Sequence, residues 1–119
     1  MSFCVIVAYG KEQVDKATIG FTLANAALDL REKVSVALAG EGVWLAFKGY
    51  ADELDNGSPF KPLNELIREF LDKGGVLNVC TPCMQKRGIK DTYVLDGARL
   101  ISGSDLIRIL KEADRSIQL

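Results

Sequence analysis

Two cysteines separated by two residues, Cys80 and Cys83, are the side chains in this sequence with the clearest capacity for chemistry. In a chain without a secretory signal, a C-x-x-C pair indicates thiol chemistry or metal binding before a structural disulfide. The third cysteine, Cys4, lies among apolar neighbours, which predicts an inert and buried side chain. We therefore take Cys80 and Cys83 as candidate catalytic residues and leave Cys4 out of the site.

The sequence contains no histidine, which narrows the chemistry further. Histidine is the commonest general base and metal ligand, so any catalysis must use other groups. One C-x-x-C and a third cysteine cannot supply the four ligands that a structural zinc ion needs, so a metal site would require several chains. We expect neither a metal nor a cofactor in a single chain.

The residues after Cys80 predict the start of a helix that would activate the thiols. Thr81 is placed to cap this helix and Pro82 to occupy its first position. Unpaired backbone N–H groups and the positive end of the helix dipole stabilise a thiolate, and such settings lower a cysteine pKa from about 8.5 to about 3.5–7.5. The prediction is a nucleophile near neutral pH; an inert pair of small side chains is the open alternative.

Residue spacing argues against several rival sites. A phosphatase-type loop needs C-x5-R, but Lys86 stands at that position from Cys80 and Arg87 follows one residue later. A thioredoxin-type dithiol follows the first strand of its fold, whereas two predicted strands precede Cys80. Gly40-x-Gly42 lacks the third glycine of a dinucleotide-binding fingerprint, so we interpret it as a tight turn.

The elements that must position the cysteines begin with a βαβ unit. Phe3–Tyr9 is an apolar run typical of a strand covered on both faces, and Asp15–Arg31 is rich in helix formers. The strand pattern resumes at Val34–Leu38, and a right-handed crossover is expected between the two strands. Val76–Cys80 is the next strand. Cys80 therefore lies at the carboxyl end of a strand, where α/β sheets place their binding crevices.

Apolar spacing and turn residues predict the segments between and after these strands. Val43–Phe47 begins a short apolar helix whose aromatic residues either pack in the core or form a subunit interface. Leu63–Leu71 has the apolar spacing of an amphipathic helix. The strand-like parts of Thr92–Ser102 do not reveal which of them enters the sheet.

The last elements complete the alternation. Leu106–Ala113 again has helical spacing, with Ser104 as the expected N-cap, and Ser116–Leu119 is a candidate final strand. Strands and helices therefore alternate along the whole chain. This predicts a single three-layer α/β domain with a mainly parallel sheet of about five strands.

The overall composition excludes several classes of protein. The chain has 119 residues, of which 48% are hydrophobic and 26% charged, as in an ordinary globular domain. The chain has 15 Lys and Arg and 16 Asp and Glu, so its positive and negative charges nearly balance. This balance gives no electrostatic reason to expect nucleic acid as a partner. The first apolar run is too short to span a membrane, so we expect a cytoplasmic protein without a membrane partner.

Several motifs of the chain share one family pattern. The segment Val79–Ile89 combines a cysteine with a downstream Arg-Gly-Ile, and the other motifs are Ala39–Val43, Gly74-Gly75, Asp96-Gly97-Ala98 and Ala113-Asp114. With these motifs the sequence resembles the DsrE/DsrF-like family of small sulfur-relay proteins, which is related to the Tus sulfur carriers. The likeness covers nearly the full length, so we expect one DsrE/DsrF-like domain over residues 1–119.

This resemblance implies a fold, an assembly and an activity. The fold would be a flavodoxin-like α/β/α domain, and the assembly a homotrimer or homohexamer. Cys80 matches the family's carrier cysteine, which would hold sulfane sulfur as a persulfide, as in a sulfurtransferase-like carrier. Cys83, present in only part of the family, would be a resolving or auxiliary thiol. The partners would be sulfur donor and acceptor proteins or small thiols.

Two other functions stay open on the sequence alone. The first is an oligomeric binding or scaffold protein in which the C-x-x-C is structural or binds metal between subunits. The second is a dithiol redox protein in which Cys80 and Cys83 form a reversible disulfide. Slow thiol labelling would favour the scaffold, and a disulfide without a sulfur adduct would favour the redox protein.

Overall fold

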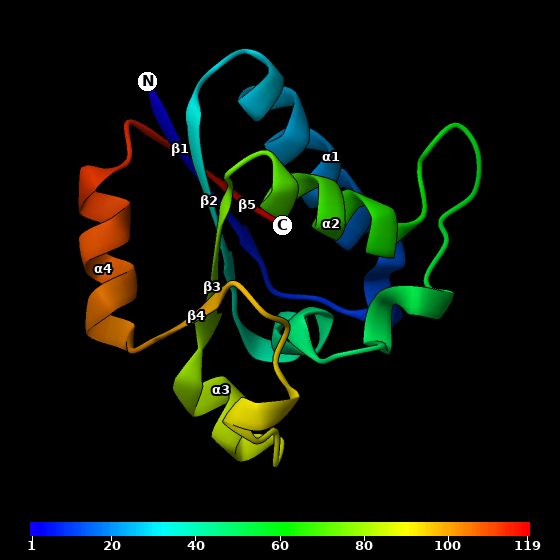
Figure 1. Cartoon of the computed structure of the whole chain (residues 1–119). Helices are drawn as coiled ribbons and strands as arrows, with labels where there is room; N and C mark the ends of the chain where they lie inside the picture. The colour runs from blue at the N-terminus through cyan, green and yellow to red at the C-terminus, as the bar shows by residue number, and fades with distance from the viewer.

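Strands and helices alternate along the chain in the computed structural model, which describes all residues from 1 to 119 (Figure 1). The strands are β1 (Ser2–Val7), β2 (Lys33–Leu38), β3 (Val76–Cys80), β4 (Ala98–Ile101) and β5 (Arg115–Gln118). The α-helices are α1 (Val14–Asp29), α2 (Leu63–Asp72), α3 (Thr81–Lys86) and α4 (Gly103–Glu112). The 3-10 helices are η1 (Lys11–Gln13), η2 (Gly40–Ala46), η3 (Tyr50–Glu53) and η4 (Asp91–Tyr93).

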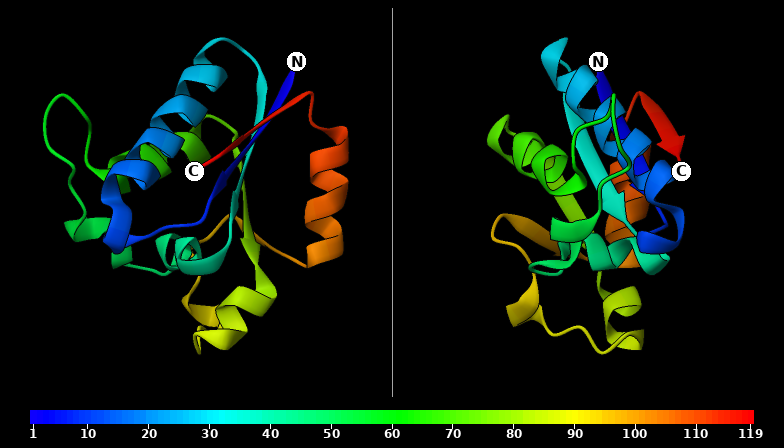
Figure 2. Two further views of the ribbon diagram at one scale, coloured as in Figure 1. Left: turned by 180° about the vertical axis from the view of Figure 1, so that it is seen from behind. Right: turned by 90° about the vertical axis from the view of Figure 1, so that its right-hand side faces the viewer.

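The five strands form one parallel sheet in the order β4-β3-β2-β1-β5. The first four strands step across the sheet in one direction, so right-handed crossovers place α1 and α2 on the same face. The final connection returns from β4 to the far side of β1, and the same handedness places α4 on the opposite face. Figure 2 shows α4 separated from α1 and α2 by the sheet. The structure confirms the predicted α/β class.

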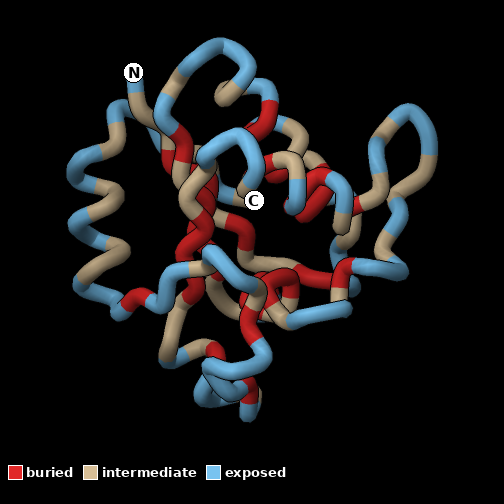
Figure 3. The backbone as a smooth tube through the Cα atoms, in the orientation of Figure 1, coloured by how far each residue is buried: buried red, intermediate tan, exposed pale blue.

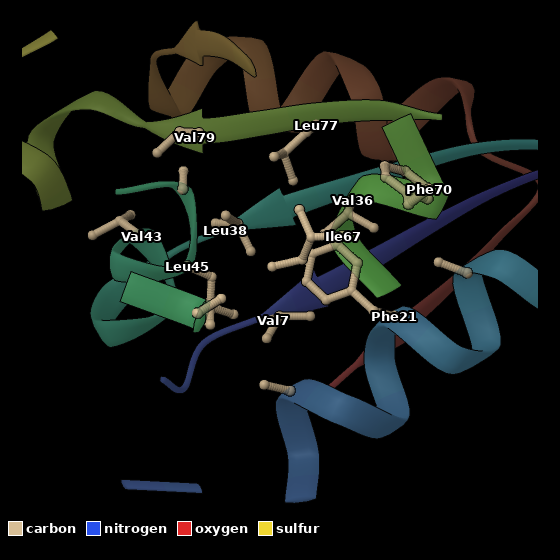
Figure 4. Close-up of a cluster of buried hydrophobic side chains, with 14 of the residues drawn as sticks. Val7, Phe21, Val36, Leu38, Val43, Leu45, Ile67, Phe70, Leu77 and Val79 are labelled. Atoms are coloured by element: carbon tan, nitrogen blue, oxygen red, sulfur yellow. The ribbon is translucent and has the colours of Figure 1, made fainter. Parts of the chain in front are cut away.

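The main core lies between the sheet and the pair α1 and α2 (Figure 4). Alternate residues of the central strands point into it in matching register, so that Val7, Leu38 and Val79 form one row across three strands. Phe21 of α1 meets Phe70 of α2 edge to face, with ring centroids 5.8 Å apart. Burial of these apolar side chains is the chief stabilising contribution to the domain.

The opposite face of the sheet is covered by α4 alone. No residue of α4 is buried (Figure 3), although its apolar residues lie on one side of the helix. A groove of about 830 Å³ runs between this helix and the sheet, and Ile107 remains 58% exposed. This layer is therefore packed much less tightly than the layer formed by α1 and α2.

Most predicted elements are confirmed, with three local corrections. Val43–Phe47 does not begin an α-helix, because η2 is a 3-10 helix that starts earlier, at Gly40. The N-cap of α4 is Ser102 and not Ser104, since the Ser102 side chain accepts a hydrogen bond from the Asp105 N–H and the Asp105 carboxylate accepts one from the Ser102 N–H. Of the segment Thr92–Ser102, only Ala98–Ile101 enters the sheet.

None of the helices has the length and the apolar character needed to span a membrane.

Candidate thiol site

The structure brings Cys80 and Cys83 together at the carboxyl edge of the sheet. Cys80 is the last residue of β3, and Cys83 lies in the first turn of α3. Both sulfurs are free thiols in half-buried side chains. Because β2 and β3 are adjacent parallel strands, the loop that follows β2 opens at the same edge and lies next to the two cysteines.

The start of α3 differs from the sequence prediction by one residue. Cys80 occupies the N-cap position, so Thr81 and Pro82 are the first two helical residues. The helix is only six residues long, and no side chain caps it. The Cys83 backbone N–H in this first turn lowers the Cys80 pKa, in the predicted direction, but it is not the main cause acting on that pKa.

The loop after β2 supplies a direct contact to one of the sulfurs. The Gly40 N–H donates a hydrogen bond to Cys83 Sγ at 3.3 Å. Gly40 has a φ of +54°, in the left-handed region that glycine tolerates, which supports the predicted turn. Gly42 packs so close to β1 that a Cβ atom there would overlap the Val7 carbonyl. These glycines let the loop lie flat across the ends of the strands.

Arg87 connects this loop to the cysteine segment. Its Nε donates to Glu41 Oε1 at 2.8 Å, and its Nη1 donates to the Cys83 carbonyl at 3.0 Å. The Arg87 side chain is only 18% exposed. Its neighbour Lys86 is exposed and makes no ion pair. We call Glu41 and Arg87 the latch, because together they join the loop after β2 to the helix that carries Cys83.

The environment of Cys80 corrects the expectation of a lowered pKa at this position. Burial is the main cause that raises the Cys80 pKa, and the hydrogen bond with the Cys83 side chain raises it further. Negative charge on Cys83 acts in the same direction, whereas the Cys83 backbone N–H and the Arg87 guanidinium oppose it. Cys80 therefore favours the neutral thiol at pH 7.

Cys4 lies apart from the pair. It is fully buried in the middle of β1, and burial raises the pKa of its thiol. Its register partner on β2 is Ser35, and Ser35 pairs with Val76 at the start of β3. Cys4 is therefore two strands away from β3, and its row in the sheet meets β3 four residues before Cys80. The chain contains no cluster of three or more cysteine, aspartate or glutamate side chains arranged to hold a metal ion.

An aromatic cluster lies beside the latch. The Trp44 and Tyr50 rings stack with centroids 5.9 Å apart, and Phe47 contacts both Trp44 and Tyr93. Trp44, Phe47 and Tyr50 are half-buried and pack against the main core, so they have the core role that the sequence left open. They also line an open cavity of about 580 Å³ that Glu41 borders.

Sequence reasoning identified both cysteines but missed the latch and the Gly40 contact. The latch joins residues 46 positions apart, and the Gly40 contact joins residues 43 positions apart. The sequence held two signals near them, the Gly-rich turn after the second strand and Arg87 in the Arg-Gly-Ile segment. Both follow strands that are adjacent and parallel, so the carboxyl ends of these strands bring them together.

Comparisons with known proteins agree on family and fold. The model of the DsrE/DsrF-like family matches residues 1–119. The uncharacterized protein MJ0989 of Methanocaldococcus jannaschii is 33% identical over 120 residues, which cover 98% of each chain. The uncharacterized protein MK0008 of Methanopyrus kandleri is 31% identical over 110 residues, which cover 92% of this chain and 84% of the relative.

Solved structures share the fold at lower sequence identity. The ychN protein from E. coli has a TM-score of 0.73 and 16% identity, with all of both chains covered. The protein MTH1491 from Methanobacterium thermoautotrophicum has a TM-score of 0.70 and 16% identity, with coverage of 99% of this chain and 97% of the other.

Proposed function

Because this chain belongs to the DsrE/DsrF-like family, whose membership suggests a role of the sulfur-relay kind, we propose that it carries sulfane sulfur as a persulfide on Cys80. Cys83 is the second thiol of the relay. The observation that carries the proposal is the position of the two free thiols side by side, half-exposed at the carboxyl edge of the sheet.

The chemistry needs only the exchange of one sulfur atom between thiols. A donor persulfide, R–S–SH, and the Cys80 thiol give Cys80–S–SH and R–SH. An acceptor thiolate then attacks the outer sulfur, so that the acceptor becomes the persulfide and Cys80 leaves as the thiolate. No oxidant or reductant is consumed, and no histidine is required, because exchange depends on a thiolate.

The partners of this reaction are a sulfur donor and a sulfur acceptor, either small thiols or proteins. The open aromatic cavity beside the latch supports an approach from this side, since aromatic rings are enriched where proteins meet.

We also propose that the chain assembles with copies of itself, as a trimer or hexamer, through α4 and β4. The support is the strongly one-sided α4, which has no buried residue, together with Ile107 and Leu100, which are 58% and 40% exposed. A second copy that presents the same apolar residues would cover both.

The test of the relay is the intact mass of the protein after incubation with glutathione persulfide. The wild type is expected to gain the mass of one sulfur atom, and a reductant is expected to remove it. The control is the double variant Cys80→Ser/Cys83→Ser, which keeps Cys4 and is expected to gain nothing.

Two results would contradict the relay. A wild-type protein that gains no sulfur, with slow alkylation of both cysteines, would favour the scaffold. A reversible Cys80–Cys83 disulfide without any sulfur adduct would favour a dithiol redox protein.

A further inference from the structure

We propose that Cys83, and not Cys80, takes the sulfur atom from the donor, and that Cys83 then passes it to Cys80. The latch of Glu41 and Arg87 is a positioning device that holds Cys83 Sγ at the Gly40 N–H. This inference rests on the proposed relay and assigns an order to its two thiols.

The two sulfurs have unequal surroundings. Cys83 Sγ accepts the hydrogen bond of the Gly40 N–H at 3.3 Å, and a donor at this distance stabilises negative charge on sulfur. Both side chains are half-buried, but burial and the hydrogen bond with the Cys83 side chain raise the Cys80 pKa and outweigh the Cys83 backbone N–H and the Arg87 charge, which lower it. The Gly40 N–H and the Cys80 thiol therefore both act on Cys83 Sγ, and we assign the attack on the donor to this sulfur.

The latch explains how the donor N–H stays in place. Gly40 belongs to the loop after β2 and Cys83 to α3, so nothing in the local chain fixes their separation. Arg87 spans the gap, because it donates to Glu41 of the loop at 2.8 Å and to the carbonyl of Cys83 itself at 3.0 Å. Both ends of the Gly40–Cys83 contact are therefore tied to one guanidinium group.

The relay then proceeds in two balanced steps. The Cys83 thiolate attacks the outer sulfur of R–S–SH, so that a Cys83–S bond forms, the donor S–S bond breaks and R–S⁻ departs. The departing thiolate takes the proton of Cys80. Cys80 attacks the outer sulfur on Cys83, which forms Cys80–S–SH and releases Cys83 as a thiolate.

The second step has a physical driving force. A thiolate that is better stabilised is a better leaving group, and the Gly40 N–H stabilises Cys83 as it departs. The sulfur atom therefore comes to rest on Cys80, and Cys83 is restored for the next cycle.

The rate of persulfide loading tests the order of the two thiols. Cys80→Ser and Cys83→Ser are each mixed with glutathione persulfide at pH 7, and intact mass is followed with time. We expect Cys80→Ser to load at the wild-type rate. Cys83→Ser should load more slowly than the wild type, because burial still raises the Cys80 pKa and reduces the thiolate fraction at pH 7. Its rate should approach that of the wild type as the pH is raised.

The outcomes separate this inference from the relay itself. If Cys83→Ser loads at the wild-type rate and Cys80→Ser does not load, the order proposed here is wrong and the relay through Cys80 stands. If the wild type does not load, both are wrong. Thermal melting of each variant checks that the serine side chain leaves the fold intact.

Variants without the latch test its positioning role, because the loss of a hydrogen bond and the loss of a negative charge move the pH profile of Cys83 in opposite directions. Iodoacetamide alkylation of Cys83 is measured against pH in the Cys80→Ser background. Loss of the Glu41 negative charge alone would move the profile to lower pH, whereas loss of the latch frees Cys83 from the Gly40 N–H and moves it to higher pH. We expect Glu41→Ala and Arg87→Gln both to move the profile to higher pH, because alanine at position 41 leaves Arg87 Nε without its acceptor.

The control for the latch is Lys86→Gln, which removes a positive charge from the same helix without breaking any ion pair. Its profile should move to higher pH by less than the profile of Arg87→Gln, because only a charge is lost. A Glu41→Ala profile that moves to lower pH, or equal shifts in Lys86→Gln and Arg87→Gln, would overturn the positioning role.

Discussion

Substitution of Gly42 by alanine tests whether the loop after β2 must lie against β1 to complete the site. A Cβ at this position would overlap the carbonyl of Val7, which is fixed within the sheet and cannot rotate away as a flexible side chain could. Overpacking a core typically costs about 1–3 kcal/mol, and a rigid backbone obstacle places this case near the upper value. We expect Gly42→Ala to lower the free energy of unfolding by about 3 kcal/mol, a large part of the roughly 5–15 kcal/mol that stabilises a domain.

The same substitution should weaken the thiol site. Relief of the overlap requires the loop to move away from β1, and the movement carries Gly40 away from Cys83. We therefore expect slower alkylation of Cys83 at pH 7 in the folded protein. Urea unfolding measures the loss of stability, and labelling below the unfolding transition measures the reactivity.

A matched control is Gly103→Ala, because a Cβ at Gly103 meets nothing within 4 Å and this residue begins α4. Its stability should stay equal to that of the wild type or rise by up to about 0.5 kcal/mol. If Gly42→Ala unfolds at the same urea concentration as the wild type, the close approach to Val7 does not constrain the loop and the reasoning fails.

Three further perturbations test other parts of the structure. Phe70→Ala removes the fully buried partner of Phe21, so urea unfolding should show a loss of about 3–5 kcal/mol. The Ser102 N–H hydrogen bond is the main cause that lowers the Asp105 pKa. The stabilisation from this bond is therefore present above the ordinary carboxyl value of about 4 and is lost as the pH falls through the lower folded value. The stability of Asp105→Asn should depend less on pH in that window. Ile107→Lys should reduce the mass of the assembly in sedimentation while the separated chain stays folded by circular dichroism, because the side chain is exposed in the single chain.

Each of these expectations can fail in a distinct way. A Phe70→Ala loss below about 1 kcal/mol would mean that the core collapses around the gap. Equal acid sensitivity of Asp105→Asn and the wild type would show that the cap does not contribute to the pH dependence. A monomeric wild type would remove the proposed assembly through α4, whereas an assembly that Ile107→Lys leaves intact would place the contact elsewhere.

The local pattern of the sequence determined the class of fold and the identity of the thiols. Val76–Cys80 was predictable because a short apolar run, interrupted only by Asn78, follows Gly74-Gly75 and is typical of a buried strand. The helix Leu63–Asp72 was predictable because its apolar residues recur every three or four positions. Cys80 and Cys83 were found because their spacing is itself the signal.

Helix caps show where local signals reach their limit. Ser102 and Ser104 both have side chains that can cap, and Thr81 stands beside Cys80 in the same way. The choice between neighbours depends on where the preceding strand ends and the chain turns, which tertiary packing decides. The predicted caps at Thr81 and Ser104 were displaced for this reason.

The inequality of the two thiols was decided by the tertiary structure alone. The sequence supplied two cysteines near a presumed helix start and predicted activation by the helix, whereas burial raises the Cys80 pKa and the Gly40 N–H contacts Cys83. Hydrogen bonds and burial depend on atoms brought together by the parallel pairing of β2 with β3, and the latch joins residues 46 positions apart. Residue types and spacing can name the reactive atoms, but the charge that each atom favours depends on neighbours that only the folded chain supplies.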